Sequence, residues 1–157
     1  MKAVTCFVVL MLGIVGCSGA SSSSENFTTS DAYDEQEMEA AIQRARRETD
    51  VFIRELNSNS AEDFSVKAPI SDGAAVEHFW LKDVTYRNEK FTGTIDNEPE
   101  MVANVRLGQE WSLAKDEISD WLYMKDGKMY GNYTVRPLLP SMPAEEAEFL
   151  KSILAEP

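Results

Sequence analysis

Five side chains between positions 77 and 136 are of types that can do chemistry: Glu77, His78, Asp120, Trp121 and Arg136. His78 is the single histidine of the chain, so a Ser-His-Asp relay would have to use it. The carboxylates could serve acid–base catalysis, and two carboxylates that converge could cleave a glycoside. Arg136 could clamp a carboxylate through two parallel hydrogen bonds. No serine lies in a G-x-S-x-G context, so the residue types permit a catalytic site but no motif specifies one.

Each of these candidates also has a structural interpretation. Glu77 and His78 are adjacent, so on a strand they point to opposite faces, and His78 would be a hydrogen-bonded strand residue. Asp120 precedes an aromatic run, where an acid would accept backbone or indole hydrogen bonds. Trp121 would then belong to an aromatic core, with an aromatic platform that stacks on a ligand as the alternative. Arg136 would pair with a surface acid.

Cys17 raises a different kind of chemistry, because it ends an uncharged segment. Residues 3–16 follow a short positive start and carry no charge. A run of this length is too short to span a bilayer, which needs about 20 apolar residues, but it fits the apolar part of a secretion signal. Its last four residues, IVGC, resemble a bacterial lipobox, in which the chain is cut before a cysteine that carries diacylglycerol. We therefore predict a lipoprotein signal peptide over 1–16 and attachment of lipid, including chains such as palmitate, at Cys17. An uncleaved or ordinary signal peptide is the alternative.

Residues 17–33 are rich in serine and predict a disordered tether. The lipid would hold the following domain at the cell envelope, on the outer membrane facing the periplasm if the bacterium has two membranes. With Cys6 removed and Cys17 lipidated, no thiol is left for a Cys/His zinc site, and we predict no metal and no cofactor. The formal net charge of −12 argues against nucleic acid as a partner.

Helices and strands that would position these residues begin after the tether. Residues 34–57 carry an apolar stripe at helical spacing, which predicts an amphipathic helix that docks onto the following domain. We predict strands over 64–68, 77–86, 91–95, 110–113, 118–124 and 129–135, a short helix over 100–106, and a C-terminal helix after Pro143. Pro69 would close the first strand, residues 87–90 would form a four-residue loop, and Asp126-Gly127 signals a hairpin. The prediction is α+β: a single small domain over 62–157, with a mostly antiparallel sheet, the N-terminal amphipathic helix and a C-terminal helix.

Residues 62–140 resemble the YegJ-like family of small uncharacterised bacterial domains. The resemblance rests on FSVK (64–67), EHFW (77–80), FTG (91–93), NEP (97–99), Gly108, ISDWLY (118–123), GK (127–128), Gly131 and YTVR (133–136). Some relatives in the family look secreted or lipid-anchored, which agrees with the N-terminal segment. The resemblance implies no catalytic residues.

Together these features predict a lipid-anchored envelope protein that binds another protein or a cell-wall component. Its partners would be the membrane, through the lipid on Cys17, and that envelope ligand. An envelope hydrolase of a new type is one alternative. An acidic inhibitor or immunity protein against a cationic toxin or lysozyme is the other, because net negative charge attracts cationic partners.

Overall fold

The computed structural model describes residues 33–58 and 60–156, and the predictions for the signal peptide, Cys17 and most of the tether lie outside this range. The first element is the helix α1 (Glu35–Ser58). It starts where the sequence predicts, because a side-chain oxygen of Asp34 accepts hydrogen bonds from the backbone N–H groups of Gln36 and Glu37 at 2.8 and 3.0 Å. Its buried residues, Ala45, Thr49 and Phe52, lie on the predicted apolar stripe.

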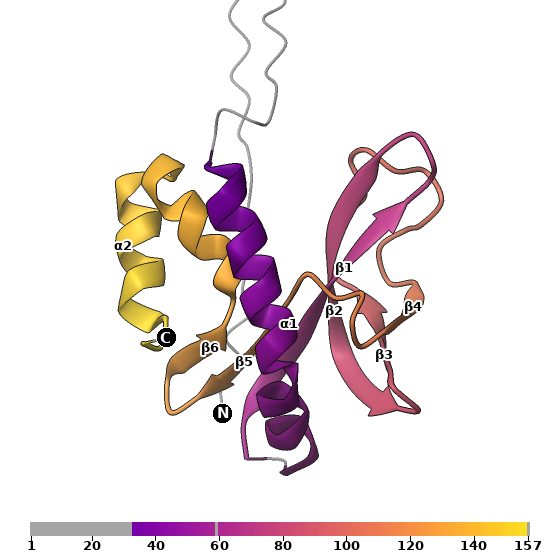
Figure 1. Cartoon of the computed structure of the whole chain (residues 1–157), viewed down its shortest axis with the longest axis horizontal. Coiled ribbons are helices and arrows are strands. Elements are labelled where there is room, and N and C mark those ends of the chain that lie inside the picture. The colour runs from indigo at the N-terminus through magenta and orange to yellow at the C-terminus, as the bar shows by residue number, and fades with distance from the viewer. Residues whose placement is uncertain (1–32, 59, 157) are drawn as a thin grey trace, which may run out of the picture.

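Six antiparallel strands form one sheet in the order β4-β3-β2-β1-β5-β6. Their bounds are β1 (Glu62–Ser71), β2 (Val76–Arg87), β3 (Lys90–Ile95), β4 (Glu110–Ala114), β5 (Asp120–Lys125) and β6 (Lys128–Gly131). A 3₁₀ segment, η2 (Tyr133–Ser141), and the helix α2 (Ala144–Ile153) complete the chain. α1 lies across one face of the sheet, and η2 and α2 gather beside β6 (Figure 1). The predicted α+β domain with its N- and C-terminal helices is therefore confirmed.

The core fills the space between α1 and the sheet. Phe52 of α1 is fully buried, and its ring lies 5.5 to 5.8 Å from the rings of Phe64, Phe91 and Trp121. Edge-on and tilted contacts of this kind are the favoured geometry for aromatic pairs. The opposite face of the sheet carries Lys67 of β1 and His78 and Trp80 of β2.

Tight turns and bulges keep the apolar side chains on the core face. Asn88 and Glu89 both have positive φ, so β2 and β3 are joined by two residues, and the predicted four-residue loop is wrong. Asp126-Gly127 forms the predicted hairpin between β5 and β6. A register shift accompanies the left-handed Asp83, and the extra residue returns β2 to the core face after the bulge.

Two predicted strand ends and one predicted helix are wrong, each for an identifiable reason. β1 continues through Pro69 to Ser71, because beyond Lys67 the strand pairs with β2 alone and can tolerate a missing N–H. No helix forms over 100–106, where side chains of the β1–β2 hairpin bind the backbone N–H groups instead. The last strand ends at Gly131, since Gly131 and Asn132 have φ of 75° and 48° and turn the chain into η2.

Candidate functional site

The predicted site residues do not converge on one point. Glu77 lies on β2 and accepts hydrogen bonds from the backbone N–H groups of Glu100, Met101 and Val102, at 2.9 to 3.3 Å. Partial burial opposes ionisation, but these N–H donors outweigh it and lower the pKa of Glu77. Its carboxylate therefore holds the loop that follows β3.

His78 points to the opposite face from Glu77 and is exposed. Its Nδ1 lies 2.8 Å from the hydroxyl of Ser119, which also donates to the backbone carbonyl of Lys67 at 3.2 Å. Desolvation and the nearby ammonium group of Lys67 lower the pKa of His78. The neutral imidazole is thus the favoured form near pH 7, in a hydrogen bond that connects β2 to the start of β5.

Asp120 is fully buried at the start of β5. One carboxylate oxygen accepts from the N–H groups of Trp121 at 2.9 Å and Tyr133 at 3.2 Å. The other accepts from both the N–H and the hydroxyl of Thr134, each at 2.7 Å. Desolvation raises the pKa of Asp120 in spite of these four bonds. The carboxylate fixes the start of η2 against β5 and has no free edge for a substrate.

Trp121 belongs to the aromatic core. It is 2% exposed, and its indole N–H donates to the carbonyl of Ala45 at 2.8 Å. A Cβ added to Gly131 would lie 2.2 Å from the Trp121 carbonyl oxygen and 2.5 Å from its ring, so only glycine fits beside it. These contacts tie β5, β6 and α1 together.

Lys67 occupies the polar face of the sheet, beside Asp120 and Trp80 in the strand register. Its ammonium nitrogen lies 3.2 Å from the Thr134 hydroxyl and 5.4 Å from the centre of the Trp80 ring. Burial lowers the pKa of Lys67, although the carboxylate of Asp120 acts in the opposite direction. The ammonium group thus balances the buried carboxylate.

Of the five predicted site residues, Arg136 lines two hollows in the surface and Trp121 lines the smaller of them. A groove of about 420 Å³ between α1 and η2 is lined by Glu37, Ala40, Ala41, Arg44, Arg47, Tyr133, Arg136 and Pro137. A smaller hollow of about 130 Å³ shares Tyr133 and Arg136 with it. We call the larger of the two the arginine groove.

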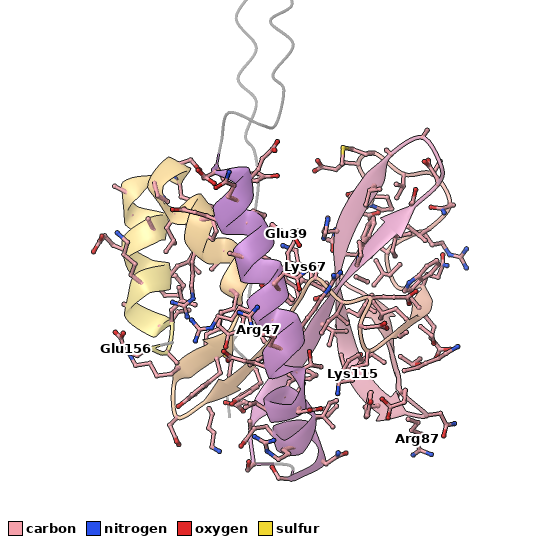
Figure 2. The ribbon with its side chains drawn as sticks, in the orientation of Figure 1. Glu39, Arg47, Lys67, Arg87, Lys115 and Glu156 are labelled. Carbon is pink, nitrogen blue, oxygen red and sulfur yellow. The ribbon has the colours of Figure 1, made fainter. Side chains whose placement is uncertain are left out.

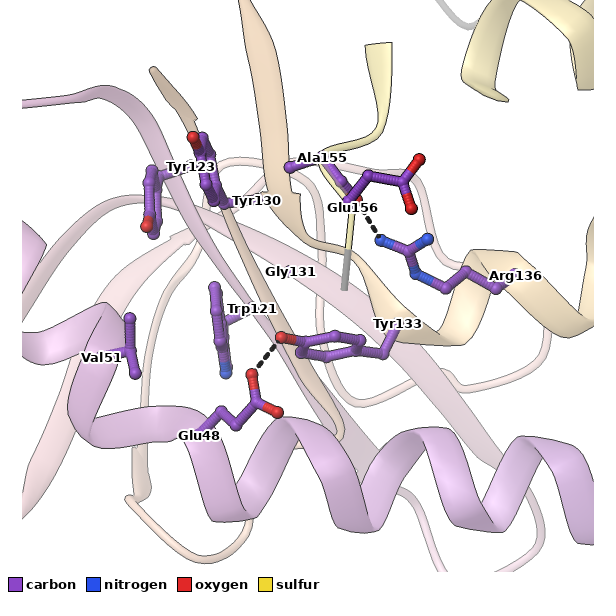
Figure 3. A pocket seen from close by; sticks show the side chains of 10 residues that line it. All are labelled: Glu48, Val51, Trp121, Tyr123, Tyr130, Gly131, Tyr133, Arg136, Ala155 and Glu156. Carbon is purple, nitrogen blue, oxygen red and sulfur yellow. Dashed lines mark hydrogen bonds between the residues drawn. The ribbon is translucent and has the colours of Figure 1, made fainter. Parts of the chain in front are cut away.

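Tyr133 forms the floor between the two hollows. Its hydroxyl donates to Glu48 of α1 (Figure 3). The Arg44 guanidinium carbon lies 4.7 Å from the centre of the Tyr133 ring. Arg44 also donates to Glu48 at 2.9 Å. Burial and the bond to Glu48 raise the pKa of Tyr133, so the phenol keeps its proton. Burial opposes ionisation of Glu48, but the hydroxyl and the guanidinium lower its pKa overall.

Two arginines of the groove keep donors available. Arg136 donates from Nη2 to the carbonyl of Ala155 at 3.0 Å, whereas its buried Nε has no partner in the described part of the chain. Arg47 is exposed on α1 (Figure 2) and enters none of the ion pairs found within residues 33–58 and 60–156. A planar guanidinium with free N–H groups is suited to bind a carboxylate.

Sequence reasoning singled out Arg136 but missed the rest of this groove. Arg44 and Arg47 lie off the apolar stripe of α1, which signals exposure and nothing more. Tyr133 and Glu48 are 85 positions apart, and no local pattern predicts their hydrogen bond. Among the described residues no group of three or more His, Cys, Asp or Glu side chains could hold a metal ion. Within the same residues no helix is long and apolar enough to cross a membrane.

The matches found in comparisons with known proteins cover nearly all of the residues that the structure describes. The family model described as "Uncharacterized protein conserved in bacteria (DUF2314)" matches residues 35–153. The chain is 48% identical over 149 residues to the Escherichia coli protein described as "Uncharacterized protein YegJ", covering 94% of this chain and 97% of that one. It is 34% identical over 116 residues to a putative ankyrin repeat protein of Neisseria meningitidis serogroup B, covering 68% of this chain and 46% of that one. No solved structure matches.

Proposed function

The chain belongs to the bacterial family DUF2314, as its resemblance to YegJ-like domains predicts, and from this premise we propose that it is a lipid-anchored envelope protein whose body binds a protein or cell-wall component. The observation that carries the proposal is the arginine groove, in which Arg47 is exposed and the Nη groups of Arg136 make one hydrogen bond among the described residues.

The place of the groove on α1 supports a role close to the membrane. Glu37, Ala40 and Ala41 lie in the first two turns of α1, directly after the predicted tether. A flexible chain of 16 residues spans roughly 22 Å. The lipid on Cys17 would therefore keep the groove within reach of ligands at the envelope.

The relative from Neisseria meningitidis supports a binding role in a second way. It is described as a putative ankyrin repeat protein, and the match covers 46% of its length, so a related domain occurs there within a longer chain. Ankyrin repeats build extended binding surfaces. A small domain joined to such repeats is consistent with a binding role.

The geometry gives no support to a hydrolase that uses Glu77, His78 and Asp120 together. Glu77 and His78 point to opposite faces of β2, and Asp120 is fully buried under four hydrogen bonds. The available donors lie instead in the arginine groove, on α1 and η2.

Photo-crosslinking in living cells tests the proposal. We expect a photo-reactive residue in place of Ala40, which is exposed and lines the groove, to give a defined adduct in the membrane fraction. The same residue in place of Lys90, the exposed first residue of β3, is the matched control and should give none. Identical adducts from both positions, or no adduct from position 40, would contradict the proposal.

A further inference from the structure

The arginine groove concentrates positive charge on an acidic chain. Three of the chain's seven arginines line it, although the formal net charge is −12. We propose that the groove binds the terminal carboxylate of a short peptide, with Arg47 and Arg136 as the contacting cations. This inference rests on the proposed function and adds the chemical class of the ligand.

Arg44 and Tyr133 have a positioning role in this site. Both donate to Glu48, and the guanidinium of Arg44 lies against the ring of Tyr133. Their donors are therefore engaged, and Glu48 is neutralised before a ligand arrives. Together they form a hydrogen-bonded group next to the other two arginines.

Arg136 has few contacts that fix its guanidinium, one of them with the ring of Tyr133, whose centre lies 5.9 Å from the guanidinium carbon. Among the described residues Arg136 makes one hydrogen bond, from Nη2 to the carbonyl of Ala155. Its Nε is the one buried side-chain nitrogen or oxygen in that part of the chain without a partner, and a buried donor without a partner is destabilising. A carboxylate that draws the guanidinium toward the groove would satisfy Nε and Nη together. The unpaired Nε of Arg136 therefore favours the binding of an anionic ligand.

The walls of the groove distinguish a peptide from other anions. Ala40, Ala41 and Pro137 are small and apolar, so they leave room for the body of a peptide next to the cations. Acidic side chains lie at this end of α1: Glu37 lines the groove, and Glu35 and Glu39 are exposed on either side of it in the sequence. A flat anionic bilayer would have to approach these carboxylates as well and would be repelled, whereas a single carboxylate can enter between them.

Calorimetric titration of the full chain, purified in neutral detergent, tests the inference. The probes are N-acetyl-Ala-Ala and its C-terminal amide, which differ only in the carboxylate. Loss of one charge-assisted bond corresponds to about a tenfold loss of affinity. We expect the amide, and separately Arg47→Gln and Arg136→Gln, to weaken binding by about this factor. Arg54→Gln removes an exposed arginine of the same helix that does not line the groove, and it should leave binding unchanged.

Equal binding of acid and amide, or no binding of either, would overturn the inference. An equal loss in the Arg54→Gln control would do the same. Vesicles with anionic lipid provide a further arm: arginine-dependent binding to them, without peptide binding, would assign the groove to the membrane instead. If adducts still form at position 40 while the peptide fails to bind, the groove is a binding site and only the ligand class is wrong.

Discussion

Replacement of Asp120 by asparagine should destabilise the fold severely while the shape of the side chain stays almost constant. Each carboxylate oxygen accepts two hydrogen bonds, one pair from Trp121 and Tyr133 and the other pair from Thr134. An amide nitrogen at either position would face two donors. The substitution therefore removes two charge-assisted bonds whichever way the amide is oriented.

The magnitude follows from these bonds. Two bonds to a charged acceptor are worth roughly 3–6 kcal/mol. Because desolvation raises the pKa of Asp120 in spite of its four bonds, burial of the ion offsets much of this gain. The loss of the negative charge next to Lys67 acts in the other direction. We expect the free energy of unfolding to fall by about 2–4 kcal/mol, a large share of the roughly 5–15 kcal/mol of a small domain.

Urea denaturation followed by tryptophan fluorescence measures this change. With a slope of about 1–3 kcal/mol per M, the midpoint should fall by about 1–2 M. Asp116→Asn, an exposed position in the β4–β5 turn, is the matched control and should stay within about 0.3 M of wild type. A midpoint for Asp120→Asn that equals the control would refute the claim that this carboxylate holds η2 against β5.

Three further predictions test the account elsewhere. Gly131→Ala should lower the free energy of unfolding by about 3–5 kcal/mol, since its Cβ would clash with the neighbouring strand. Gly73→Ala, at a position with open space and φ of 92°, should lower it by only about 1–2 kcal/mol. Equal losses of stability in urea melts would count against the packing argument. The folded-state pKa of His78 is lowered by desolvation and by Lys67, so the folded state binds fewer protons and stability should rise with pH up to about 6.5. Compared with His78→Gln, the wild type should lose more stability between pH 7.5 and 5.5, and parallel pH profiles would disprove this. Glu89→Gly should stabilise the chain by about 1 kcal/mol, because glycine accepts the φ of 60° without strain, and a lower melting midpoint would show that the turn is relaxed.

Local signals in the sequence predict much of the fold. The apolar stripe of α1, the cap at Asp34, the Asp126-Gly127 turn and the helix after Pro143 all act over a few residues, and the structure has each of them. The same local reasoning fails where distant side chains compete for the backbone. Glu77 binds N–H groups 23 to 25 residues away and prevents the predicted helix over 100–106.

The candidate site could be predicted only in part for a similar reason. Arg136 has a residue type that suggests anion binding, so the sequence alone identifies it. Its neighbours come from α1, about 90 positions earlier, through the packing of η2 against that helix. Pro137 and Pro140 lie inside the 3₁₀ segment that carries Arg136 to the groove.

Mass spectrometry of the N-terminal peptide, from chain extracted from cell membranes, tests the proposed envelope function most directly. The account predicts a mature chain that begins at Cys17, with diacylglycerol in thioether linkage to its sulfur. Cys6→Ser should leave that product unchanged, because residue 6 is removed with the signal peptide. A chain that begins at Met1 with an unmodified Cys17 would contradict the account, since nothing would then hold the arginine groove at the envelope.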